Sequence, residues 1–222
     1  MQIRKVWQVV EADHSSTSYE FYSSTAELTK KQRSNLNQYS SRASATKRKV
    51  EYTYNSEFGD LPHGAQEQIL HDFCDIMVME SFDRWEFSIR FDLSPGLADE
   101  LRKYECSEVD ECGVYVSEDE EAIILSIYTL IDYEGLIYLE PTSVGPKYPQ
   151  LWYPRFSRSK PFPSLAYLLI HLKGRILEQD FLPLQYIAAA FDVETAELLE
   201  EEDEPSALGE AFLAILRTPS NV

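Results

Sequence analysis

The sequence has no long hydrophobic run and only three cysteines among its 222 residues. Its longest uncharged apolar stretches, residues 122–131 and 161–170, each end at ten residues, whereas a membrane-spanning helix needs about twenty. No apolar segment follows Arg4 and Lys5, so we expect no signal peptide. An odd number of cysteines argues against a disulfide scaffold and for a reducing compartment. We therefore expect a soluble cytoplasmic protein that does not bind membranes.

The sequence also lacks the motifs that mark common enzyme classes. It contains no Gly-x-Ser-x-Gly, no Gly-x4-Gly-Lys and no Gly-x-Gly-x-x-Gly, and its eight glycines are scattered singly. Carboxylates are so numerous that no pair of them indicates an acid–base role. His171 lies between two apolar residues of a predicted buried helix, and we expect it to be a hydrogen-bonded core residue. These observations favour a protein without catalytic activity and without a cofactor.

Apolar side chains and acidic charge are what the sequence does contain. A hydrophobic content of 44%, with 13% aromatic residues, is enough for one large domain and excludes an intrinsically disordered chain. Thirty-eight acidic residues outnumber twenty basic ones, which gives a net charge of −18. Such a charge repels nucleic acid over most of the surface.

The charge is unevenly distributed along the chain. No acid lies between Glu27 and Glu51, where there are seven bases, or between Glu140 and Glu178, where there are six. Residues 105–121 and 192–204 each contain eight acids and no base. Two interpretations follow: the basic segments neutralise acidic surface within the protein, or the protein presents opposite charges to two different partners.

The hydrophobic pattern predicts strands first and helices last. In residues 85–93, apolar side chains alternate without exception with polar ones, which is typical of a strand with one buried face. The expected strands are residues 3–10, 17–22, 50–54, 85–93, 113–116, 122–131 and 136–139, with the first two paired across a turn and the last three paired consecutively. The expected helices are residues 25–39, 61–80, 96–105 with Ser94 as its N-cap, 164–177, 184–191, 193–202 and 206–217 with Ser206 as its N-cap.

Together these elements predict an α+β fold. We expect a mainly antiparallel sheet with packed helices in residues 1–140, followed by a small C-terminal helical subdomain in residues 164–222. Six prolines exclude regular structure from the connecting residues 141–163. Residues 40–46 have no apolar anchor and are expected to form a mobile loop.

One group of residues has the chemistry of metal ligands. His63, Glu67 and His71 repeat at a spacing of four on the predicted 61–80 helix, and Cys74 lies one turn further on. The spacing matches neither a zinc protease nor a Cys-x-x-Cys site, and His71 falls opposite the apolar stripe. An ordinary exposed helix face is therefore favoured, and a metal-dependent hydrolase is the second alternative for the function.

Residues 184–202 resemble the core pattern of helix-turn-helix units. The resemblance rests on Ile187, Ala188, Phe191, Asp192, Val193 and Leu198. It implies DNA binding, but the second helix would carry five glutamates and no base, which opposes the cation–phosphate attraction that DNA binding needs. We therefore expect a structural or protein-binding unit here.

The proline-rich segment and its neighbours also interleave aromatic and basic side chains. This composition is found in protein-interface hot spots, in single-strand nucleic-acid grooves and in loops whose aromatics pack onto the core. The candidate binding residues are Trp152, Tyr153, Arg155, Phe156, Arg158 and Lys160.

The sequence as a whole favours an intracellular protein-binding module, of the adaptor, inhibitor or immunity type. Its partner would be another protein with a basic surface, contacted by the acidic turn 117–121 or by Glu200, Glu201 and Glu202. A nucleic-acid mimic is one form of this hypothesis. The alternative is a nucleic-acid-associated component that uses the basic segments 30–49 and 147–175, the first of which has the composition of a flexible arm.

Overall fold

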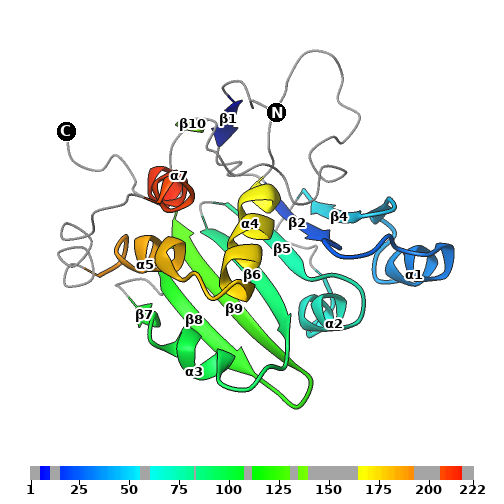
Figure 1. Ribbon diagram of the computed structural model, residues 1–222. Coiled ribbons are helices and arrows are strands. Elements are labelled where there is room, and N and C mark those ends of the chain that lie inside the picture. Colours follow the sequence, from blue (N-terminus) through cyan, green and yellow to red (C-terminus); the bar gives the residue numbers. More distant parts are fainter. Residues whose placement is uncertain are drawn as a thin grey trace. The chain divides into compact units, whose positions relative to one another are not determined.

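The computed structural model describes residues 6–10, 16–55, 61–82, 84–107, 112–130, 135–139, 165–192 and 206–216 (Figure 1). Contacts within the chain gather into two units. The first, which we call the sheet unit, is Ala12–Leu130, and the second, the helical unit, combines Met1–Glu11 with Ile131–Val222. The sequence placed its boundaries elsewhere, at residues 140 and 163.

The sheet unit is built on one antiparallel sheet of eight strands. Their spatial order is β3-β4-β2-β5-β6-β9-β8-β7. The strands are β2 (Thr17–Tyr22), β3 (Ser44–Ala45), β4 (Lys49–Tyr54), β5 (Ile76–Ser81), β6 (Arg84–Asp92), β7 (Cys106–Ser107), β8 (Gly113–Glu118) and β9 (Ala122–Leu130). The chain has a mixed α+β fold with a large antiparallel sheet, as its pattern predicts.

Three helices belong to the sheet unit: α1 (Lys30–Leu36), α2 (Ala65–Asp72) and α3 (Leu97–Arg102). Helix α1 begins with a capping box, in which Thr29 and Gln32 each satisfy a backbone N–H of the other. The other two begin after a glycine in the left-handed conformation, Gly64 and Gly96, where residues with a Cβ are strained. Ser94 is therefore not the N-cap of α3, and this prediction is wrong.

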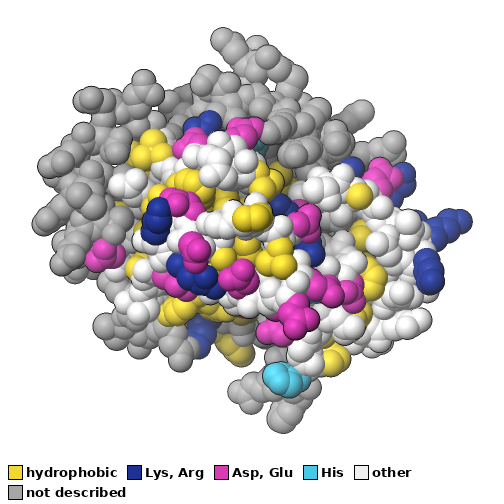
Figure 2. Space-filling view, turned by 60° about the horizontal axis from the view of Figure 1, so that its bottom comes forward, with side chains coloured by type: hydrophobic (Ala, Val, Ile, Leu, Met, Phe, Trp, Pro, Cys, Tyr) yellow, Lys and Arg dark blue, Asp and Glu magenta, His cyan; other side chains and the backbone are white. Residues whose placement is uncertain are grey.

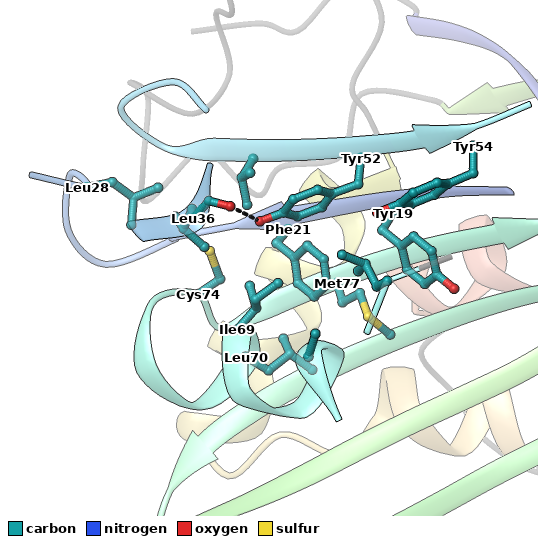
Figure 3. Close-up of a cluster of buried hydrophobic side chains, with 13 residues drawn as sticks. Tyr19, Phe21, Leu28, Leu36, Tyr52, Tyr54, Ile69, Leu70, Cys74 and Met77 are labelled. Atoms are coloured by element: carbon teal, nitrogen blue, oxygen red, sulfur yellow. Dashed lines mark hydrogen bonds between the residues drawn. The ribbon is translucent and has the colours of Figure 1, made fainter. Parts of the chain in front are cut away.

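One face of the sheet, which we call the α2 face, carries an aromatic core (Figure 3). Cross-strand register puts Phe21 between Val50 and Met77 on this face, and α2 buries Ile69 and Leu70 in the same cluster. Complete burial of each such side chain contributes about 2 kcal/mol. The Tyr52 hydroxyl donates a buried 2.8 Å hydrogen bond to the backbone carbonyl of Leu36, which ties α1 to β4.

The opposite face of the sheet is apolar along its central strands. In β6 the side chains of Trp85, Phe87, Ile89 and Phe91 are all buried, so the predicted strand and its apolar face are confirmed. The other face is not solvent-exposed as expected, because Ser88 is buried as well. Leu93 follows the strand and is 45% exposed. Strand β9 pairs with β6 along its whole length, and most of its residues are buried, as expected for a central strand.

The helix predicted for residues 61–80 is only half right. The structure has α2 over Ala65–Asp72 and then strand β5 over Ile76–Ser81. A turn at Cys74 and Asp75 separates them, and the Asp75 carboxylate accepts hydrogen bonds from the backbone N–H and the hydroxyl of Ser24. Periodicity does not distinguish a short apolar run such as Ile-Met-Val-Met from a buried helix; pairing with β2 and β6 decides it.

Two predicted pairings are also wrong. Strand β1 (Val6–Val10) pairs with β10 (Gly135–Leu139), not with β2. Strand β9 has β6 and β8 as neighbours, not β10. Both predictions assumed that strands adjacent in sequence pair with each other. In the structure, β1 and β9 instead pair with strands that are distant in the sequence, β10 and β6.

Residues 40–46 differ from the expected loop without apolar anchors. They contain β3, which pairs with β4, and Ala43 and Ala45 pack against the aromatic core. The helix expected over residues 25–39 is shorter, because α1 covers only Lys30–Leu36.

At each edge of the sheet lies a two-residue strand, and next to it one charged side chain bonds a backbone group of the neighbouring longer strand. Beyond β7, the backbone N–H of Val116 donates to the Glu105 carboxylate at 2.9 Å. Beyond β3, the Arg42 guanidinium donates to the Thr53 carbonyl at 3.4 Å and lies over the Tyr54 ring. Unpaired backbone groups at sheet edges invite pairing with other chains, so these side chains shield the edges.

The helical unit contains the β1–β10 pair and the helices α4 (Leu165–Leu177), α5 (Leu182–Ala188) and α7 (Ala207–Leu216). Helices α5 and α7 pack closely, since a Cβ at Gly209 would collide with the Tyr186 ring. The Ser206 hydroxyl accepts the backbone N–H of Gly209 at 3.1 Å, so the predicted N-cap is confirmed. Among the described residues, no helix is both long enough and apolar enough to cross a membrane.

Candidate functional site

The aromatic and acidic residues singled out from the sequence lie outside the described residues. These are Trp152, Tyr153, Arg155, Phe156, Arg158, Lys160, Glu200, Glu201 and Glu202. The second helix of the helix-turn-helix resemblance, residues 193–202, lies outside them too, as do the connecting residues 141–163. The predictions about these segments stay predictions.

The residues with metal-ligand chemistry do not meet at one point. Cys74 is buried in the aromatic core, where burial raises the pKa of its thiol, whereas His63 and Glu67 are exposed. In the part of the chain that the structure describes, no three His, Cys, Asp or Glu side chains are arranged to hold a metal ion.

His71 contacts the acidic turn between β8 and β9. Its Nε2 atom lies 3.2 Å from the Glu121 carboxylate and 4.0 Å from that of Asp119, and its Nδ1 atom lies 3.5 Å from Asp72. The sequence placed His71 in solvent, but its side chain is only 24% exposed. This contact joins the end of α2 to the turn.

The His71 contact brings together a surface that we call the acidic end. It consists of Asp72, Asp92, Asp119, Glu120 and Glu121. Asp92 belongs to it because its strand position is opposite Ala122, next to the turn. Figure 2, which brings the bottom of Figure 1 forward, shows carboxylate side chains gathered on this side of the molecule.

Backbone groups and cations hold part of the acidic end in place. Asp119 accepts the backbone N–H groups of Glu121 and Ala122, both at 2.8 Å, and these bonds lower the pKa of its carboxyl, with further help from His71 and Arg90. Arg90 also donates to Asp92 at 2.9 Å. Most of the carboxylate surface remains exposed: 91% for Asp92, 71% for Glu121 and 58% for Asp119.

The basic segment 30–49 is partly neutralised within the sheet unit. Lys47 pairs with Glu27 at 3.0 Å, and Lys49 pairs with Glu20 and with Glu51. Arg48 donates to the carbonyls of residues 23 and 24 instead. Internal neutralisation, the first interpretation of the charge pattern, therefore applies to part of this segment.

A hydrogen-bonded network lies on the α2 face, across β6 and β9. The register sets Glu86 opposite Tyr128 and Ser88 opposite Ser126. Ser88 donates to Glu86 at 2.7 Å, and the two serine hydroxyls are 2.9 Å apart. The Tyr128 hydroxyl bonds both Glu86 and Ser126, which closes the ring. Tyr115 on β8 packs edge-on against the Tyr128 ring.

Burial dominates the electrostatics of this network. It raises the pKa of the Glu86 carboxyl, against the hydrogen bonds from Ser88 and Tyr128, which lower it. It also raises the pKa of Tyr128 to about 12, helped by the Glu86 charge. Glu86 can therefore hold a proton more readily than an ordinary glutamate. However, Ser88 is fully buried and Ser126 is 8% exposed, so neither hydroxyl is open to a substrate, and we interpret the network as structural.

His171 is a partly buried histidine of the helical unit. It lies on α4, where burial and the nearby Arg175 lower its pKa to about 4. It is therefore neutral near pH 7. Its side chain is only partly buried, so the expected role as a core residue stays a prediction.

Sequence reasoning identified the acidic turn 117–121 of the acidic end, but it predicted neither the contact of the turn with His71 and Asp92 nor the network. The position of Asp92 beside the turn and the network depend on pairing between β6 and β9, which lie about thirty residues apart in the sequence. The one hint of the network was polar: Ser126 interrupts the apolar run of β9, and it faces Ser88.

No family model, no curated protein and no solved structure matches this chain.

Proposed function

We propose that this protein is a non-catalytic protein-binding module, of the adaptor, inhibitor or immunity type, whose acidic end engages a basic surface on another protein. The observation that carries the proposal is the separation of charge along the strand order of the sheet. Described residues 16–55, which form β2, β3, β4 and α1, contain seven cations and three acids. Described residues 61–130, which include β6, β8 and β9, contain four cations and thirteen acids.

The acidic end has the properties of a surface that steers a charged partner. Its five carboxylates have only His71 and Arg90 as close basic neighbours among the described residues. Charge of one sign concentrated in this way speeds association with a partner of opposite charge, and it does so most at low salt. We also propose a cytoplasmic location, which the small and odd number of cysteines, three, supports.

The first test is affinity capture from a nuclease-treated lysate of the native host. A captured protein is then purified, and its association rate is measured at several salt concentrations. The acidic-end variant is Asp92→Asn, Glu120→Gln, Glu121→Gln, which leaves Asp119 and its turn intact. The matched control, Glu27→Gln, Glu51→Gln, Asp99→Asn, removes the same charge elsewhere on the sheet unit.

The proposal predicts that the acidic-end variant associates about tenfold more slowly at low salt, while the control associates at the unchanged rate. Equal rates for all three proteins would contradict the role of the acidic end. Recovery of nucleic acid that is lost on nuclease treatment, without any protein that survives it, would favour the alternative function, a nucleic-acid-associated component. Stoichiometric metal in elemental analysis would favour the metal-dependent hydrolase.

A further inference from the structure

The surface formed by residues 25–47 has an unusual composition. Fourteen of these residues are exposed, and only Ala26 and Glu27 among them are neither cationic nor hydroxyl- or amide-bearing. The other twelve are Lys30, Lys31, Arg42 and Lys47, with Thr25, Thr29, Ser34, Asn37, Gln38, Ser41, Ser44 and Thr46. Together these two groups supply the side chains that most often contact phosphate oxygens in nucleic-acid complexes.

The fold presents this surface on a stable frame. The capping box at Thr29 fixes the start of α1, and burial of Leu36 and its bond with Tyr52 fix its end. The β3–β4 turn is closed by bonds of Thr46 with Lys49. Figure 2 shows Lys and Arg side chains projecting at the right of the view, on the side where Figure 1 places α1.

Two cations of this surface have no anionic partner among the described residues. Lys30 and Lys31, both exposed, form no ion pair there. The one acid in the surface, Glu27, is surrounded by positive charge: it pairs with Lys47, and Arg48 and Arg33 also lower the pKa of its carboxyl. The Glu27 carboxylate therefore already binds beside several cations. Lys30 and Lys31 remain available for a second anion.

We propose that the exposed surface of residues 25–47 binds the phosphodiester backbone of a nucleic acid without sequence preference. This function goes beyond the proposed binding of a basic protein by the acidic end, and it uses the opposite side of the charge separation. An anionic membrane surface is a less suitable partner, because membrane binding also needs exposed apolar side chains that insert into the lipid. Among the described residues, the exposed large apolar side chains are Phe82, Leu93 and Leu177, and all three lie outside residues 25–47.

The binding is expected to be weak and strongly dependent on salt. Lys30, Lys31 and Arg42 are exposed and have no carboxylate partner among the described residues. Three such cations that contact phosphates of a single strand give a slope of log K against log salt of about −2. The net charge of −18 repels the same strand over the rest of the molecule, so low ionic strength is needed to observe binding.

The test is fluorescence anisotropy of the full chain with a labelled oligothymidylate over a range of NaCl concentrations. The variant Lys30→Gln, Lys31→Gln removes two cations from α1. The matched control Arg102→Gln, Lys103→Gln removes two cations from α3, so both variants carry the same net charge. The result expected is that the salt slope falls by about 0.7 for each lysine removed from α1 and that Kd rises, with the control unchanged.

Three results would overturn the proposal. One is the absence of salt-dependent binding by the unchanged chain at low ionic strength. Another is an equal loss of binding in the α1 and α3 variants, which would indicate general charge rather than this surface. The third is tighter binding to vesicles that contain phosphatidylserine than to the oligonucleotide. Circular dichroism of each variant checks that the substitutions, all at exposed positions, leave the fold unchanged.

Discussion

At the scale of single residues, the two buried tyrosines of β4 differ in the hydrogen bonding of their hydroxyl groups. Removal of the hydroxyl should therefore change the stability of the protein differently at the two positions. The Tyr52 hydroxyl donates to the buried carbonyl of Leu36, whereas the buried Tyr54 hydroxyl has no hydrogen-bond partner among the described residues. Tyr52→Phe should lower the free energy of unfolding by about 1 kcal/mol, because it removes a buried hydrogen bond, while the Leu36 carbonyl keeps the backbone N–H of Tyr39 at 3.3 Å. Tyr54→Phe should leave it unchanged or raise it, because it removes a polar atom that burial penalises.

Urea unfolding of both variants measures these changes directly. The two substitutions delete the same atom from the same strand, so each is the control for the other. An equal loss of stability in both would contradict the assignment of the Tyr52 bond, and so would a loss confined to Tyr54→Phe.

Glu86 gives a prediction about pH. Because burial raises the pKa of its carboxyl in the folded protein, the folded state binds more protons than the unfolded state just above the ordinary value of 4.5. The contribution of Glu86 to stability is therefore fully present below that value and is lost as pH rises through the folded pKa. Glu86→Gln has no carboxyl to ionise, so it should gain stability relative to the unchanged chain as pH rises to neutrality.

Unfolding by urea at a series of pH values from acidic to neutral tests this difference. Glu120→Gln, at an exposed position on the β8–β9 turn, removes the same charge and corrects for the change in net charge. If the Glu86→Gln difference did not vary with pH, or varied as it does for Glu120→Gln, burial of Glu86 would not be the cause.

At the scale of elements, local pattern and long-range pairing explain different parts of the fold. The strand β6 could be predicted because each apolar side chain is buried and its neighbour is polar, so the residues alone specify the strand. Strand β5 could not, because its four apolar residues fit a helix or a strand equally well until β2 and β6 pair with it. The pairing of β1 with β10 was missed for the same reason, since no local feature identifies a partner more than a hundred residues away.

The edges of the sheet give a prediction at this scale. The Glu105 carboxylate accepts the backbone N–H of Val116 on β8, and β7 covers only part of that strand. Glu105→Ala should expose this N–H and allow β8 strands of two molecules to pair, which increases self-association. Glu105→Gln retains an oxygen acceptor and should behave as the unchanged chain.

Sedimentation velocity over a range of protein concentrations compares the three proteins. Concentration-dependent association of Glu105→Ala alone would agree with a shielding role for the carboxylate. Association of both variants would point to the loss of negative charge, and association of neither would show that the β7 strand shields the edge without Glu105.

At the scale of the whole molecule, the amount of charge was visible in the sequence but its arrangement was not. The acidic turn 117–121 could be recognised from four consecutive acids. Its contact with His71 and its position beside Asp92 could not, because they require α2, β6 and β9 to meet. The basic segment was recognised as charged, but its ion pairs could not be predicted. The pairs of Lys47 with Glu27 and of Lys49 with Glu20 on β2 are evident only in the fold.

This arrangement predicts how salt affects stability. Self-repulsion among the surplus carboxylates opposes the compact state, whereas each exposed ion pair contributes only about 0.2–1 kcal/mol. Raising NaCl from about 0.1 M to about 1 M shortens the screening length from about 10 Å to about 3 Å. This screening should weaken the repulsion among the carboxylates more than the attraction within the ion pairs, so the Tm should rise with NaCl.

The two charge variants designed for the binding test locate the source of this effect. Asp92→Asn, Glu120→Gln, Glu121→Gln relieves repulsion at the acidic end. It also removes the contacts of Asp92 with Arg90 and of Glu121 with His71, but such exposed pairs contribute little, so its Tm should start higher at low salt and rise less. Glu27→Gln, Glu51→Gln, Asp99→Asn removes carboxylates that pair with Lys47, Lys49 and Arg102, so it should lose stability at low salt and keep a steep dependence. A Tm that falls with NaCl in the unchanged chain would mean that the ion pairs outweigh the repulsion. In that case, pairing between the charged segments, rather than their separation, would dominate the electrostatics of this protein.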